Sequence, residues 1–136
     1  MELSRNQQNY IIMTVVYNEI NDSVFGDEQR DARQLMEELC EVPFEEVPDY
    51  IKNVVYYSLN KYDEIVSAFV PHLKNWTWKR IPSITKAVLV MSYAHYTYVE
   101  QINKKIIISI AIELAKKYID EKQAKFINAI LDEVLK

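Results

Sequence analysis

The stretch Ile106-Ile-Ile-Ser-Ile-Ala-Ile-Glu-Leu-Ala-Lys-Lys-Tyr118 decides the fold class of this chain. Its first residues are rich in β-branched side chains and could form a strand if they stood alone. The longer pattern argues against a strand, because apolar and polar positions recur at helical spacing and fall on opposite faces. The apolar face carries Ile107, Ile110, Ala111, Leu114 and Tyr118, and the polar face carries Ser109, Glu113, Lys116, Lys117 and Asp120. The stretch therefore predicts an amphipathic helix.

The same helical spacing covers most of the chain on either side. Apolar stripes of this kind occupy residues 13–20, 32–39, 51–69 (with a break expected near Asn60), 84–98 and 126–134. No segment shows the strict alternation of a half-buried strand, and no linker is long enough to separate two domains. We therefore predict an all-α protein, a compact bundle of about six or seven helices that fills residues 1–136 as a single domain. Residues 71–80 should form a short helix or an ordered loop.

Short polar patterns mark where several of these helices begin. Ser4-x-x-Gln7 and Asp120-x-x-Gln123 both have the spacing of a capping box, and Asp27 can cap the second helix. Pro43 ends that second helix, because proline cannot continue one.

Composition excludes several classes of protein. The 136 residues include one Gly and four Pro, too few for a turn-rich β protein or for a glycine-rich phosphate loop. Cys40 is the only cysteine, so an internal disulfide and a Cys-x-x-Cys metal site are both excluded. The longest apolar run is far too short to span a bilayer. We expect a cytoplasmic protein that has no membrane segment.

The sequence offers no convincing catalytic centre. His72 and His95 lie far apart and lack the arrangement of a zinc hydrolase, and His95 falls on an apolar stripe, where a core or interface role is expected. Cys40 has acidic neighbours, which raise a thiol pKa and disfavour a nucleophilic role. We predict that the chain is not an enzyme and needs neither a cofactor nor a metal.

Charge is distributed unevenly along the chain. The net charge is −4, but residues 1–50 contain three Lys or Arg and twelve Asp or Glu, whereas residues 51–136 contain thirteen and eight. No acidic residue occurs between Glu64 and Glu100. Lys74, Lys79, Arg80 and Lys86 all lie in that interval. A surface built from this interval should hold a positive potential despite the acidic total.

The segment Lys74-Asn-Trp-Thr-Trp-Lys-Arg80 has two interpretations of equal weight. Trp76 and Trp78 beside Lys79 and Arg80 could stack on bases and bind phosphates of single-stranded RNA. Alternatively, a tryptophan could anchor the segment between helices while the cations face water. The ten tyrosines of the chain are better explained by packing at the rim of a helical core than by a platform for bases.

Three blocks of the carboxyl-terminal half resemble the NusB family. Residues 78–89 (WKRIPSITKAVL) resemble the family pattern that leads into "KAVLR", residues 108–116 (ISIAIELAK) resemble "INEAIELAK", and residues 125–132 (KFINAILD) resemble "KFVNGVLD". The blocks occur in the family's order and nearly at its spacing. The opening of the chain, with Arg5 and Tyr17, resembles the family more weakly.

The resemblance implies both an architecture and a function. It implies two packed three-helix halves and a role as a transcription antitermination factor for ribosomal RNA operons. NusB proteins pair with NusE, a small-subunit ribosomal protein, and the pair binds boxA RNA within the RNA polymerase antitermination complex. No reaction is catalysed. The resemblance also allows a homodimer. The alternative is a protein-interaction module that keeps the fold but has reduced or lost RNA binding.

The resemblance carries candidate site residues, and the chain departs from the family pattern at its opening. The family's opening is rich in arginine and contacts RNA, but here only Arg5 is followed by the amides Asn6, Gln7 and Asn9. Amides bind bases or phosphates without releasing counterions, so RNA binding at this end should be weaker and less sensitive to salt. The cations expected to carry more of the binding are Lys79, Arg80, Lys86 and Lys125. The partner-binding candidates are Tyr17, Phe126 and Asn128, although the first two could be core residues and Asn128 could serve as a cap.

Overall fold

The computed structural model describes residues 2–21 and 31–136. In that part, the protein consists of helices and contains no strand, which confirms the all-α prediction. The α-helices are α1 (Arg5–Ile20), α2 (Ala32–Cys40), α3 (Asp49–Asn60), α4 (Tyr62–Phe69), α5 (Ser83–Ala94), α6 (Lys104–Tyr118) and α7 (Glu121–Val134). Three 3-10 turns, η1 (Phe44–Glu46), η2 (Val70–His72) and η3 (Trp78–Arg80), and a π-helical turn, η4 (His95–Val99), join them. None of the helices described is both long and apolar enough to cross a membrane.

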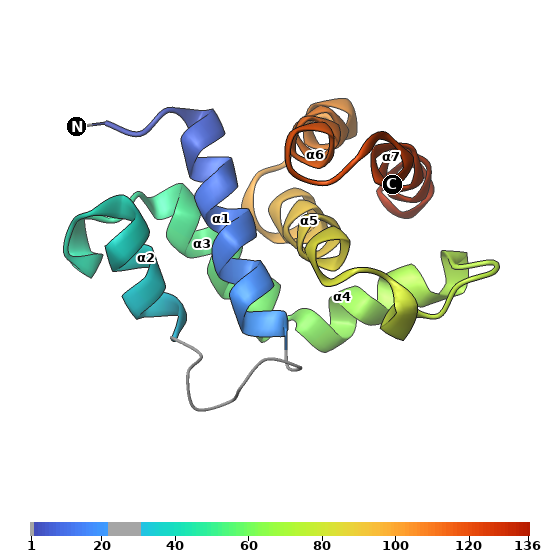
Figure 1. The fold of residues 1–136 in the computed structure, drawn as a ribbon, viewed down its shortest axis with the longest axis horizontal. Helices are drawn as coiled ribbons and strands as arrows, with labels where there is room; N and C mark the ends of the chain where they lie inside the picture. Colours follow the sequence, from blue (N-terminus) through green and yellow to red (C-terminus); the bar gives the residue numbers. More distant parts are fainter. Residues whose placement is uncertain (1, 22–30) are drawn as a thin grey trace.

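The helices form the two halves that the sequence resemblance implies (Figure 1). In the first half, α1 packs against α2 and α3, and in the second half α6 and α7 pack closely together beside α5. The halves join mainly through the contact of α1 with α5, and α4 connects them. The core runs through this junction, where Val15 and Val16 of α1 and Val88 and Leu89 of α5 are fully buried.

The two predicted capping boxes have different outcomes. At α1 the box is complete, because the Gln7 amide donates to Ser4 Oγ at 3.1 Å and the Ser4 amide donates to Gln7 Oε1 at 2.7 Å. At α7 only half of it forms. The Gln123 amide donates to Asp120 Oδ1 at 2.7 Å, but Gln123 Oε1 accepts from the Thr85 hydroxyl at 2.9 Å. A tertiary hydrogen bond that ties α7 to α5 thus replaces the second half of this box.

The start of α2 and the junction of α3 with α4 also follow local chemistry, but the N-cap of α2 is not the residue that the sequence suggested. Helix α2 begins at Ala32, and its N-cap is Asp31, whose side chain accepts from the Gln34 amide. Asp27, which the sequence suggested as the cap, lies outside the described residues. The break expected near Asn60 is present, because α3 ends at that residue and α4 begins at Tyr62.

Candidate nucleic-acid interface

The two rings of the tryptophan-rich segment lie in different surroundings, one packed between helices and one at the surface. Trp78 is half-buried, and its ring stacks on the fully buried Phe69 at a centroid distance of 5.7 Å. Its indole N–H donates to the Tyr62 hydroxyl at 3.1 Å. Trp76 leaves 50% of its surface exposed. Trp78 is therefore the anchor, and it holds the exposed Trp76 beside the cations of η3.

A cleft of about 140 Å³ lies next to Trp76. Its lining consists of Trp76, Ile81, Pro82, Lys122, Gln123 and Phe126. The hydrogen bond between Thr85 and Gln123 holds the first turns of α5 and α7 together and so fixes the cleft walls. Trp76 and Phe126 provide aromatic surface, and Lys122 adds a cation. We call these six lining residues the Trp76 cleft.

None of the four predicted cations lines the Trp76 cleft, but Arg80 and Lys125 each directly precede a residue that does. Lys79 and Arg80 are exposed on η3, and Lys125 is exposed on α7, one residue before Phe126. Lys86, on α5, donates to the Lys79 carbonyl oxygen at 3.5 Å, and its ammonium lies 5.8 Å from the Trp78 ring centroid. In the part of the chain that the structure describes, Lys79, Arg80 and Lys125 form no ion pair. The structure thus leaves their charges available at one end of the molecule.

The N-terminal candidates lie elsewhere and do not act as one group. Helix α1 begins at the upper left of Figure 1, while η3 and α7 lie at the right. The Arg5 guanidinium stacks over the Tyr50 ring at 3.8 Å. Asn6 is exposed, whereas the Gln7 side chain is engaged in the α1 cap and Asn9 is only 3% exposed. Arg5, Asn6 and Gln7 are therefore exposed, and Asn9 is the member of this set that does not face solvent.

The partner-binding candidates occupy three parts of the surface. Tyr17 lies on the last turns of α1 with 37% of its surface exposed. Phe126 is partly buried against the core and lines the Trp76 cleft. Asn128 is exposed and lines a shallow groove between α6 and α7.

Most of the tyrosines contact other rings, as expected for residues at the rim of a core. Tyr57 stacks on Tyr98 at 5.3 Å and meets Tyr56 edge-on at 5.1 Å. Tyr93 in turn contacts both Tyr98 and Phe69.

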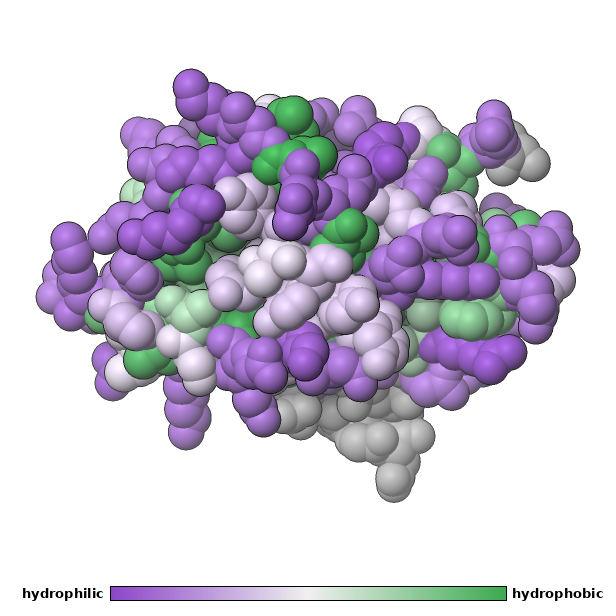
Figure 2. Space-filling view, turned by 180° about the vertical axis from the view of Figure 1, so that it is seen from behind, coloured by the Kyte–Doolittle hydropathy of each residue, from purple (hydrophilic) through white to green (hydrophobic). Residues whose placement is uncertain are grey.

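Figure 2 shows the face turned away from the viewer in Figure 1, where side chains of intermediate hydropathy gather at the centre and hydrophilic ones surround them.

A buried polar network, which sequence reasoning did not detect, joins the start of α1 to α3 and η4. His95 is 4% exposed, so the predicted core position is confirmed. Its Nε2 lies 3.3 Å from Glu100 Oε1, and its Nδ1 lies 3.3 Å from the Tyr50 hydroxyl, which donates to Asn9 Oδ1. Arg5 pairs with the same Glu100 oxygen at 3.3 Å. Because a carboxylate only accepts hydrogen bonds, Nε2 carries the proton in neutral His95.

The network makes stability depend on pH. Burial lowers the pKa of His95 below its ordinary value of 6.5, although the nearby Glu100 carboxylate acts in the opposite direction. The unfolded chain therefore binds a proton more readily than the folded one, and the free energy of unfolding should fall as the pH drops below about 6.5. We expect His95→Gln to reduce this fall, as measured by urea denaturation between pH 7.5 and pH 5 (roughly the range in which histidine titrates).

His72 supplies the matched control for this prediction. Its side chain is 29% exposed, and its Nδ1 lies 3.7 Å from the Glu133 carboxylate. His72→Gln should leave the acid-side loss of stability in place. An unchanged pH dependence in the His95→Gln protein would contradict the role assigned to the buried imidazole.

No arrangement for metal chemistry emerges in the part of the chain that the structure describes. Over residues 2–21 and 31–136, no cluster of three His, Cys, Asp or Glu side chains could hold a metal ion. Burial raises the pKa of the Cys40 thiol. A raised pKa disfavours the thiolate form and agrees with the expectation that Cys40 is not a nucleophile.

Comparison with known proteins identifies the family. The model of the NusB family matches residues 5–136. A protein of Finegoldia magna named transcription antitermination protein NusB is 32% identical and aligns over 98% of this chain and 95% of its own length. A Macrococcus caseolyticus protein of the same name is also 32% identical, over 64% of this chain, and the match spans 66% of that protein. NusB proteins are non-catalytic antitermination factors, in agreement with the prediction that the chain is not an enzyme.

A solved structure shows the same fold. The NusB chain of a crystal structure of the antitermination factors NusB and NusE in complex with double-stranded RNA superposes with a TM-score of 0.78. The superposition covers 96% of this chain and 95% of that one, at 21% sequence identity. Because the family model covers nearly the whole sequence and the fold agrees with it, this chain belongs to the NusB family of transcription antitermination proteins.

Proposed function

We propose that this chain is a non-catalytic adaptor of transcription antitermination that binds boxA-type single-stranded RNA together with NusE. It would act on ribosomal RNA operons, within the RNA polymerase antitermination complex and in the cytoplasm. The observation that carries the proposal is the Trp76 cleft, whose lining combines the half-exposed ring of Trp76 and the ring of Phe126 with the cation Lys122. Stacking on aromatic rings together with phosphate neutralisation is how proteins hold single-stranded nucleic acid.

Two further observations support this function. The chain belongs to the NusB family, and a NusB protein of the same fold has been crystallised with NusE and RNA. In addition, Arg80 directly precedes the cleft residue Ile81, and Lys125 directly precedes the cleft residue Phe126. Cations next to an aromatic cleft favour a polyanion as its ligand.

The test is a binding titration of a boxA-type RNA, with and without purified NusE. We expect the chain to bind this RNA, and to bind it more tightly with NusE than alone, while a scrambled RNA of the same length binds more weakly. Failure of the chain to bind either RNA, with or without NusE, would refute the RNA-binding function.

The second candidate is a NusB-fold interaction module with reduced or lost RNA binding. Its support is the net charge of −4 and the internal engagement of Gln7 and Asn9, which the family pattern would place in the RNA-contacting opening. In the same titration, this candidate predicts that NusE binds the chain and that RNA changes neither the affinity nor the stoichiometry. Light scattering of the free chain tests the homodimer that the resemblance allows.

A further inference from the structure

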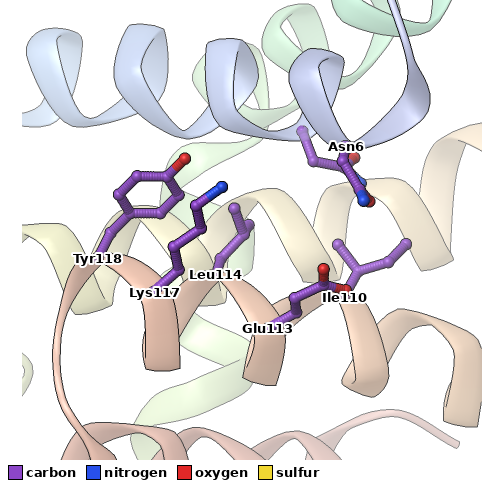
Figure 3. Close-up of a pocket in the computed structure, with 7 residues that line it drawn as sticks. Asn6, Ile110, Glu113, Leu114, Lys117 and Tyr118 are labelled. Atoms are coloured by element: carbon purple, nitrogen blue, oxygen red, sulfur yellow. The ribbon is translucent and has the colours of Figure 1, made fainter.

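A second cleft lies between the first turns of α1 and the middle of α6 (Figure 3). It measures about 50 Å³, which suits the edge of one flat ring rather than a whole nucleoside. Ile110 and Leu114 of α6 provide its apolar surface. Asn6 points across from α1 toward Ile110 and Glu113, while Lys117 and Tyr118 stand at the other end of the cleft. We call it the Asn6 cleft.

An exposed aromatic pair borders the Asn6 cleft. The rings of Tyr10 and Tyr118 are in contact at a centroid distance of 4.8 Å. Even so, Tyr10 remains 38% exposed and Tyr118 37% exposed. The ammonium of Lys117 lies 5.4 Å from the Tyr118 ring centroid. The pair therefore leaves aromatic surface available for stacking, with a cation beside it.

Two polar side chains of the Asn6 cleft, Asn6 and Glu113, are uncommitted, whereas Asn9, which also lines it, accepts from the Tyr50 hydroxyl. Within the described residues, neither Asn6 nor Glu113 forms a hydrogen bond or an ion pair. The Asn6 carboxamide offers both donors and an acceptor, whereas the Glu113 carboxylate offers only acceptors. Such groups can read the edge of a base, and a carboxylate selects an edge that carries an amino group.

The charge around the Asn6 cleft favours a nucleic acid over an acidic protein segment. The exposed surface of α6 carries three lysines against a single acid, Glu113; Lys117 lines the Asn6 cleft, and Lys105 and Lys116 line the neighbouring groove between α6 and α7. Lysines at this spacing attract phosphates, while Glu113 is positioned to accept from a base amino group. A polyanion whose bases carry hydrogen-bond donors satisfies both kinds of group.

We propose that the Asn6 cleft binds one base of single-stranded RNA. The base ring stacks on Tyr118, its amino group donates to Glu113, the Asn6 carboxamide pairs with the neighbouring edge atoms, and Lys117 meets the adjacent phosphate. The inference rests on the proposed RNA-binding function and adds a site with base preference to it. Stacking and hydrogen bonding here would substitute for the ionic contacts that the arginine-poor opening of the chain lacks.

The test uses the full chain and labelled oligoadenylate, oligocytidylate and oligouridylate of equal length. We expect tighter binding of the two oligomers whose bases carry an amino group. Tyr118→Ala should weaken binding of oligoadenylate by about 5- to 150-fold, the effect of removing one stacking partner. Tyr56→Ala is the matched control, because Tyr56 is 56% exposed and lies outside both clefts. It should bind like the unchanged protein.

Base preference provides a readout that a merely structural role would not alter. Glu113 is exposed, so Glu113→Gln should fold normally. It should shift the preference toward oligouridylate, because the new amide can donate to the uracil carbonyl oxygens. The control is Glu46→Gln, an equal change of charge at an exposed site on η1. It should leave the preference unchanged.

Two results would overturn the inference, and they differ in what else they affect. If Tyr118→Ala and Glu113→Gln bind all three oligomers like the unchanged protein, the Asn6 cleft is not a base site, while the proposed RNA-binding function stands. If the unchanged protein binds no oligomer and no boxA-type RNA, with or without NusE, the proposed function fails and this inference fails with it.

Discussion

Replacing Phe69 with alanine is expected to lower the free energy of unfolding by about 3–5 kcal/mol, the usual cost of truncating a buried phenylalanine. Phe69 is 0% exposed at the end of α4, where its ring meets Trp78 at 5.7 Å and Tyr93 at 5.8 Å. The deletion would leave a cavity among these rings, which the surrounding helices can only partly fill. Urea denaturation followed by circular dichroism measures the effect.

The same substitution should also disturb the Trp76 cleft. Trp78 rests on Phe69 and anchors the segment that carries Trp76, so loss of the ring beneath it loosens one cleft wall. Tyr56→Ala serves as the control, since that exposed ring should change stability by less than about 1 kcal/mol. If the free energy of unfolding of the Phe69→Ala protein fell by less than about 1 kcal/mol, Phe69 would not be the centre of packing at the end of α4.

Neutralising Lys79, Arg80, Lys86 and Lys125 together, each to glutamine, is expected to weaken binding of boxA-type RNA by roughly 10²–10³-fold near 0.1 M salt. Each phosphate contact on a single strand contributes about 0.7 to the slope of log K against log salt. Removal of all four cations should therefore make the slope shallower by about 3. A salt titration of RNA binding measures both quantities.

A pair of matched double variants separates local contacts from overall charge. Lys79→Gln with Arg80→Gln removes two cations beside the Trp76 cleft, whereas Lys52→Gln with Lys61→Gln removes two from α3 and the α3–α4 junction. The first pair should reduce both affinity and slope, and the second should have little effect. A steep slope that survives the fourfold neutralisation would refute the assignment of RNA contacts to these cations.

Much of the fold could be predicted from the sequence because helix formation is governed by nearby residues. The apolar spacing in residues 106–118 identified α6, and Ser4 and Gln7 located the start of α1. Hydrogen bonds that close within three or four residues can be read from short patterns. The unequal distribution of charge, which concentrates cations after Glu64, is likewise a property of the sequence.

The candidate site was less predictable, because side chains from distant segments form it. The sequence left Trp76 and Trp78 equivalent, and only packing against Phe69 distinguishes the anchor from the exposed ring. In the same way, Arg5 meets Glu100 across 95 residues, and nothing local to either residue indicates the pair. The Gln123 side chain, predicted to close a local cap, instead bonds Thr85 on α5.

The sequence by itself determined that this chain folds into helices, where α1 and α7 begin, that its middle and end are cationic, and which family it resembles. Tertiary structure alone decided that Lys122 lines the Trp76 cleft, that Asn9 and His95 are buried together, and that Asn6 faces Glu113 across a second cleft. The physical reason is the separation along the chain over which each kind of interaction acts. Backbone hydrogen bonds and helical periodicity act between near neighbours, whereas the proximity of distant side chains depends on how whole helices pack.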